Sequence, residues 1–74
     1  MTPLRVARKM RKLTQQQLAL AVGVTQSHIS SIETGGDHAS AQLAEKLVEV
    51  IGRQWISEEE ILYPERFIRF EKQA

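Results

Sequence analysis

Few side chains in this sequence could carry out covalent chemistry or bind a metal ion. His28 and His38 are its two histidines, and it contains no cysteine. No glycine-rich phosphate loop accompanies them, and no nucleophile and base are spaced to share a pocket in so short a chain. One histidine falls on a predicted helix and the other in a loop, without the ligand spacing of a zinc site. The sequence therefore predicts a protein that is not an enzyme and has no metal, cofactor or small-molecule ligand.

A different kind of chemistry is indicated by the stretch "TQSHISSIETGG", residues 25–36. When residues 26–34 are phased as a helix, Ile29 and Ile32 fall on one buried stripe. A helix this short is not stable alone, so neighbouring elements must support it. The opposite face carries only short hydroxyl side chains, at Ser27, Ser30, Ser31 and Thr34.

Short polar side chains let another surface come within hydrogen-bonding distance of the helix. The major groove of DNA is about 12 Å wide and admits an α-helix. Gln26, at the predicted N-terminus, suits a bidentate contact with N6 and N7 of adenine, and Ser27 can donate to or accept from a base edge. The free N–H groups at helix N-termini also attract phosphate, which makes Gln15 and Gln26 candidates for positions near the DNA backbone.

Five short helices are predicted to position this face. Helix-start signals are hydroxyl residues before apolar positions, and glycine or proline marks the ends. The expected apolar positions are Leu4, Ala7 and Met10 in the first helix, with Arg8 as a further candidate on the same face. They are Leu18, Ala21 and Val22 in the second helix, and Leu43, Leu47, Val50 and Ile51 in the fourth. The predicted helices run from Pro3 to about Lys12, from about Gln15 to Val22, from about Gln26 to Thr34, from a cap at Ser40 or Asp37 to Gly52, and from Ser57 to Pro64.

These elements predict an all-α fold, a compact bundle of about five short helices in a single domain over residues 1–74. The core is expected over about residues 2–62. The C-terminal extension, residues 63–74, is ambiguous between helix and strand. Its apolar residues either complete the core or form a dimer contact; they are Phe67, Ile68 and Phe70.

Composition and charge support a nucleic-acid partner. The chain has 74 residues, of which 42% are hydrophobic and 26% charged. No apolar run is long enough to span a bilayer, and the N-terminus lacks a secretory signal, so a cytoplasmic, nucleoid-associated protein without a membrane partner is expected. Residues 1–32 hold five basic residues and no acid, whereas residues 33–74 hold five basic and nine acidic residues. This asymmetry is typical of a protein with one basic face towards a polyanion, although a solvated basic first helix would give the same counts.

The stretch "TQQQLALAVGVTQSHISSIETG" resembles the helix-turn-helix of the lambdoid phage repressor and Cro family, also called the Xre-type family. The matching positions are an initial glutamine, a small residue where the helices cross, a glycine in the turn and a β-branched residue in the second helix. The small residue allows close approach of the two backbones, and glycine accepts the turn. The resemblance covers about residues 4–52, and the four positions are Gln15, Ala19, Gly23 and Ile29.

The resemblance also implies roles for individual residues. Base reading falls to Gln26, Ser27 and Ser31, and an ion pair is implied between Arg8 and Glu33. Flanking or phosphate contacts are implied at Gln15, His28, Ser30 and Thr34, to which the basic residues Arg11 and Lys12 are added as phosphate contacts.

The loop after Glu33 departs from the family pattern. Many members carry basic residues and a proline there, whereas this chain has "GGDHAS". Asp37 would repel phosphate. The loop therefore either stands off the duplex or makes a different contact through His38 and the glycines.

The predicted function is that of a sequence-specific transcriptional regulator of double-stranded DNA. A phage or prophage Cro-like protein or small repressor, bound as a homodimer to a palindromic operator, fits the resemblance. The alternative is an antitoxin-like or adaptor protein that uses the same fold mainly for protein–protein contact. Small polar groups on the exposed face favour DNA, because a protein interface would carry aromatic anchors or arginine.

Overall fold

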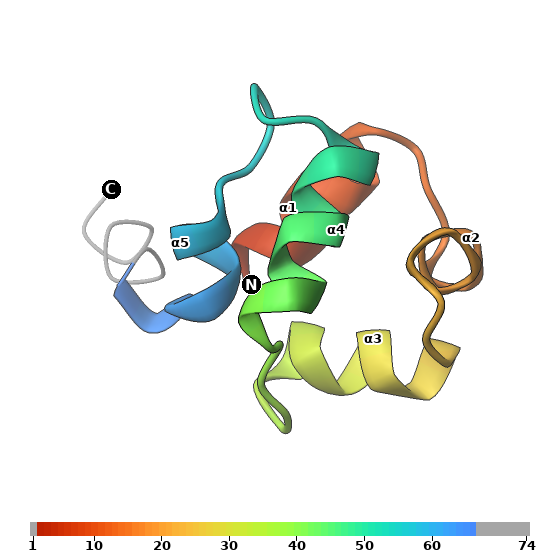
Figure 1. Ribbon diagram of the computed structural model, residues 1–74, viewed down its shortest axis with the longest axis horizontal. Helices are drawn as coiled ribbons and strands as arrows, with labels where there is room; N and C mark the ends of the chain where they lie inside the picture. Colours follow the sequence, from red (N-terminus) through yellow and green to blue (C-terminus); the bar gives the residue numbers. More distant parts are fainter. Residues whose placement is uncertain (1, 67–74) are drawn as a thin grey trace.

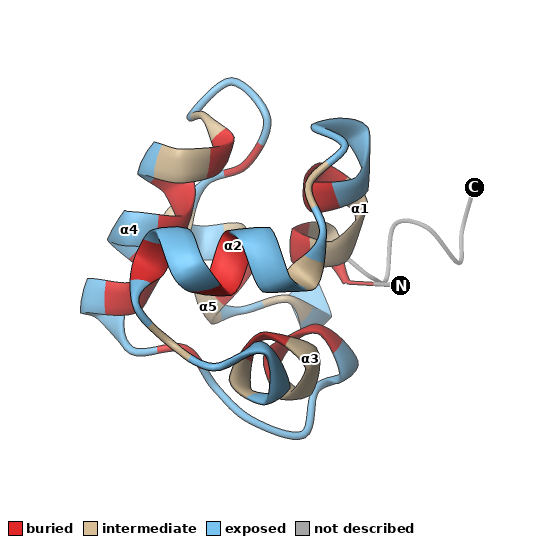
Figure 2. Ribbon diagram, turned by 90° about the vertical axis from the view of Figure 1, so that its right-hand side faces the viewer, coloured by how far each residue is buried: buried red, intermediate tan, exposed pale blue. Residues whose placement is uncertain are grey.

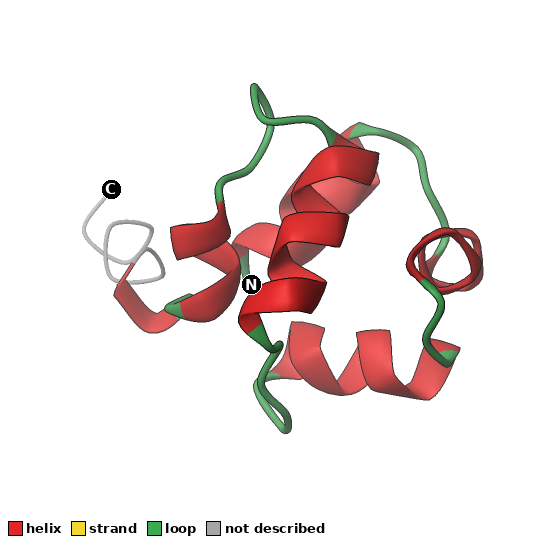
Figure 3. Cartoon of the chain, viewed as in Figure 1, coloured by secondary structure: helices red, strands yellow, loops and turns green. Residues whose placement is uncertain are grey.

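The computed structural model of the chain describes residues 2–66 and is shown in Figure 1. It contains α1 (Pro3–Met10), α2 (Gln15–Val22), α3 (Gln26–Thr34), α4 (Ala41–Ile51) and α5 (Glu58–Leu62). Figure 3 shows these helices joined by loops, with no strand in the described part of the chain. The predicted all-α fold of about five short helices is therefore confirmed. The tail residues singled out by the sequence, Phe67, Ile68 and Phe70, lie outside the described residues.

Every helix begins with a hydroxyl side chain that accepts a backbone N–H of the first turn. These caps are Thr2, Thr14, Thr25, Ser40 and Ser57. In α2 and α5 the capping is reciprocal, because the third helical residue, Gln17 or Glu60, accepts the N–H of the capping residue. Each such cap contributes about 1 kcal/mol. The local signals thus determine where the helices start, and Ser40 rather than Asp37 caps α4.

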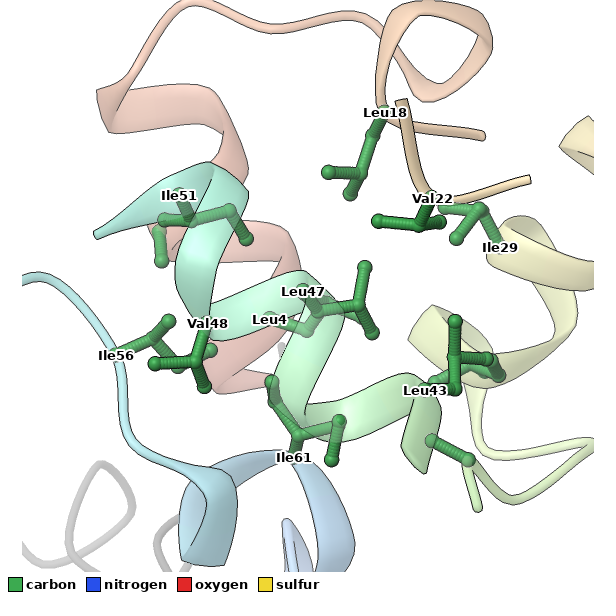
Figure 4. Packing of buried hydrophobic residues seen from close by; sticks show 14 of the residues in the cluster. Leu4, Leu18, Val22, Ile29, Leu43, Leu47, Val48, Ile51, Ile56 and Ile61 are labelled. Carbon is green, nitrogen blue, oxygen red and sulfur yellow. The ribbon is translucent and has the colours of Figure 1, made fainter. Parts of the chain in front are cut away.

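The core lies around α4, which packs against both α2 and α5. Leu47, Val48 and Ile51 of α4 are completely buried. Figure 4 shows Leu47 between side chains from α1, α2 and α3, and Ile56 and Ile61 beside Val48. The short helices are therefore stabilised by a shared apolar interior rather than by their own length.

Two predicted core positions are wrong, because Met10 is 59% exposed and Ala21 is exposed. Val50 is half-buried and packs against the core. In α1 the buried stripe consists of Leu4, Ala7 and Arg8, and Met10 lies about 120° from Leu4 around the helix axis. In α2, Ala19 lies on the buried side in place of Ala21, and in α4 Val48 is buried in addition to the predicted positions. The positions of apolar residues alone therefore did not predict how α1 and α2 are rotated about their own axes.

The end of α1 also differs from the prediction. The helix ends at Met10, and Arg11 is its C-terminal cap. Lys12 then adopts a left-handed backbone conformation with φ 58°. Its N–H and that of Leu13 bond back to the carbonyls of Lys9 and Arg8. The left-handed conformation of Lys12 and these two hydrogen bonds turn the chain towards α2, although no glycine is present at this position.

Candidate DNA interface

α2 and α3 form a helix-turn-helix. Gly23 adopts φ 79°, and its N–H and that of Val24 both donate to the carbonyl of Ala19, at 2.9 and 3.0 Å. Ala19 itself is 2% exposed, so its small side chain lies in the packed interior next to the turn. Figure 1 views α2 along its axis and α3 from the side, which shows that the two helices cross steeply. The turn needs the left-handed conformation that glycine adopts readily.

The buried side of α3 is narrow. Ile29 is 0% and Ile32 5% exposed, and both belong to the hydrophobic core. Figure 2 shows α3 at the lower edge of the molecule, with exposed and half-buried residues along it. The polar side chains lie away from the core: Gln26, Ser27 and Thr34 are exposed, and His28, Ser30 and Ser31 are half-buried.

Arg8 and Glu33 connect α1 to the end of α3. Arg8 Nε lies 2.6 Å from Glu33 Oε2, and a second guanidinium N–H donates to Oε1 at 3.1 Å. The third nitrogen donates to the carbonyl of Leu13 at 2.8 Å. The side chains are 9% and 1% exposed, so this bidentate pair is buried. Thr2 adds a second link, because its hydroxyl donates to the carbonyl of Glu33 at 2.9 Å.

Gln15 belongs to the same cluster. Its side-chain nitrogen donates to Glu33 Oε1 at 3.1 Å. One of the two side-chain N–H groups is therefore engaged inside the protein, which limits how the Gln15 amide can turn towards a phosphate. The second side-chain N–H and the backbone N–H at the first position of α2 are the donors left for the predicted phosphate contact.

Thr34 is also engaged within the protein. Its hydroxyl lies 3.1 Å from the carbonyl of Ser30 and 3.2 Å from that of Ser31, so it donates to the last turn of α3. The side chain is exposed and keeps acceptor capacity. A phosphate contact through Thr34 requires its hydroxyl to rotate away from these carbonyls.

The loop after α3 folds back on the helix. The N–H groups of Gly36 and Asp37 donate to the carbonyl of Ser31, at 2.8 and 3.2 Å. Asp37 Oδ2 then lies 3.0 Å from His28 Nδ1, and Oδ1 accepts the N–H of His38 at 2.9 Å. Asp37 is thus paired with the histidine predicted as a flanking DNA contact. The sequence analysis did not predict this pair, because residue spacing does not show that a loop with two glycines folds back onto the preceding helix.

The two predicted phosphate-binding cations lie together after α1. Arg11 and Lys12 are both exposed. The guanidinium of Arg11 lies over the ring of Trp55, 5.7 Å from its centroid. The sequence analysis did not predict a role for Trp55. Arg11 and Trp55 are far apart in the chain, so no local sequence pattern indicates this contact. A cation–π contact of this kind limits the positions that the Arg11 side chain adopts.

Residues 2–66 contain neither a cluster of metal-ligating side chains nor a membrane-spanning helix. This part of the chain contains no group of three or more histidine or acidic residues placed to hold a metal ion. None of its helices has the length and hydrophobicity that a bilayer crossing requires.

Comparison with known protein families finds a match. The model of a helix-turn-helix family matches residues 4–55, about seven tenths of the chain. Comparisons with curated proteins and with solved structures find no match. The matched segment includes α1 from its second residue, α2 to α4, the glycine turn and the buried Arg8–Glu33 pair. The family is one of regulatory, generally non-enzymatic proteins, and membership indicates a DNA-binding transcription regulator. The chain belongs to this helix-turn-helix family, of the Cro and Xre type.

Proposed function

We propose that the protein is a sequence-specific transcriptional regulator that inserts α3 into the major groove of its operator. The observation that carries the proposal is the outer face of α3, where exposed Gln26 and Ser27 and half-buried Ser31 project from a helix whose other side is in the core. Side chains of this length let the helix approach base edges closely. Their chemistry fits hydrogen bonds to bases, with Gln26 directed at adenine.

The phosphate contacts in this proposal come from the start of α2, from the residues before it and from the later part of α3. Gln15 supplies the first backbone N–H of α2, and the exposed cations Arg11 and Lys12 lie just before it in the chain. Ser30 and Thr34 lie further along α3. Contacts of this kind fix the register of the protein on the duplex without reading sequence.

The operator proposed is a palindrome bound by a homodimer. Two copies of α3 would then enter successive major grooves about 34 Å apart, which corresponds to half-sites about 10 base pairs apart. A small phage or prophage repressor, or a Cro-like protein, is the role that this arrangement fits.

The test is selection of the purified protein against a randomised duplex library, followed by titration of the selected sequence. An inverted repeat with the stated spacing supports the dimeric regulator, and a single unpaired half-site supports DNA reading by a monomer. No enrichment, with weak binding that depends only on salt, contradicts the proposal and favours the protein-binding alternative.

Gln26→Ala tests the base-reading role directly. We expect it to weaken operator binding by about 1 to 3 kcal/mol and to relax preference at one base pair. Gln42→Ala is the matched control, because Gln42 is an exposed glutamine on α4, outside the proposed interface. An equal loss on every sequence for Gln26→Ala would contradict base reading by this residue.

A further inference from the structure

We draw no further inference here: the strongest candidate, the cavity between the end of α3, the loop that follows it and α5, carries nothing, because its lining includes Pro64 and Glu65, close to the limit of the described residues, and nothing in the structure shows what covers it.

Discussion

At the scale of single residues, Glu33 has the most connected position in the candidate interface. Its carboxylate accepts from Arg8 and Gln15, and its backbone carbonyl accepts from Thr2. These bonds join both ends of α1 and the start of α2 to the end of α3. A substitution here therefore changes the placement of α3 as well as the stability of the fold.

Removal of either partner of the buried pair should be strongly destabilising. We expect Arg8→Ala or Glu33→Ala to reduce the free energy of unfolding by about 3 to 5 kcal/mol, because each leaves an uncompensated buried charge. Urea unfolding at pH 7 measures this loss. The double variant Arg8→Met with Glu33→Leu should recover part of it, because both charges are then absent. Losses below about 1 kcal/mol in both single variants would show that the pair is hydrated in solution.

Lys12 is the one described residue other than glycine with a positive φ, at 58°. Glycine adopts this conformation without the steric cost of a side chain, so Lys12→Gly should stabilise the protein by about 1 kcal/mol. Thermal unfolding of the free protein measures the change. The control is Lys46→Gly, at an exposed position inside α4, where glycine should instead cost about 1 kcal/mol. Destabilisation by Lys12→Gly would show that the side chain of Lys12 makes contacts that outweigh the backbone strain.

At the scale of secondary-structure elements, α2 has one side in the core and one side in solvent. Leu18 is 0% exposed and packs in the core, whereas Leu20 is 76% exposed on the same helix. The two leucines have the same helix propensity, so a comparison between them isolates packing. It also tests the rotation of α2, which hydrophobicity alone did not predict at Ala21.

Leu18→Ala should reduce the free energy of unfolding by about 2 to 5 kcal/mol, through lost burial and the cavity left behind. Leu20→Ala should change it by less than about 0.5 kcal/mol. Chemical denaturation of both variants under one set of conditions is the measurement. Comparable losses would mean that α2 is rotated differently in solution or that Leu20 is covered in an assembly.

At the scale of the whole molecule, charge is distributed unevenly. The first 32 residues carry a formal charge of +5 and the remaining 42 carry −4. The net charge of +1 therefore conceals a basic N-terminal part that contains α1, α2 and most of α3. For a protein that binds DNA through this part, affinity should depend on salt through the phosphates it neutralises.

Lys12→Ala should weaken binding to all sequences alike and reduce the slope of log K against log salt by about 0.9, the value for one phosphate contact. Titrations of the selected operator between low and moderate salt measure this slope. Lys46→Ala is the matched control, since Lys46 is exposed on α4 outside the proposed interface. If both variants reduce the slope equally, DNA attraction comes from the overall charge of the protein and not from a contact at Lys12.

Local sequence determined the starts of the helices and the limits of α2 and α3. The bounds of α2 and α3 match the predictions, because the caps Thr14 and Thr25 and the glycines Gly23 and Gly35 act within one turn of the chain. The outward polar face of α3 was also predictable, since the spacing of two isoleucines establishes its rotation. These features depend on neighbours in sequence, and a pattern of residue types records them directly.

Tertiary structure decided which polar groups meet. The contacts of Gln15 with Glu33, Arg11 with Trp55 and His28 with Asp37 join residues that are distant in sequence or separated by a loop. The rotations of α1 and α2, which leave Met10 and Ala21 outside the core, were likewise decided by the packing of several helices together. Side-chain partners depend on distances of a few ångströms between elements, and such distances exist only once the helices have packed around α4.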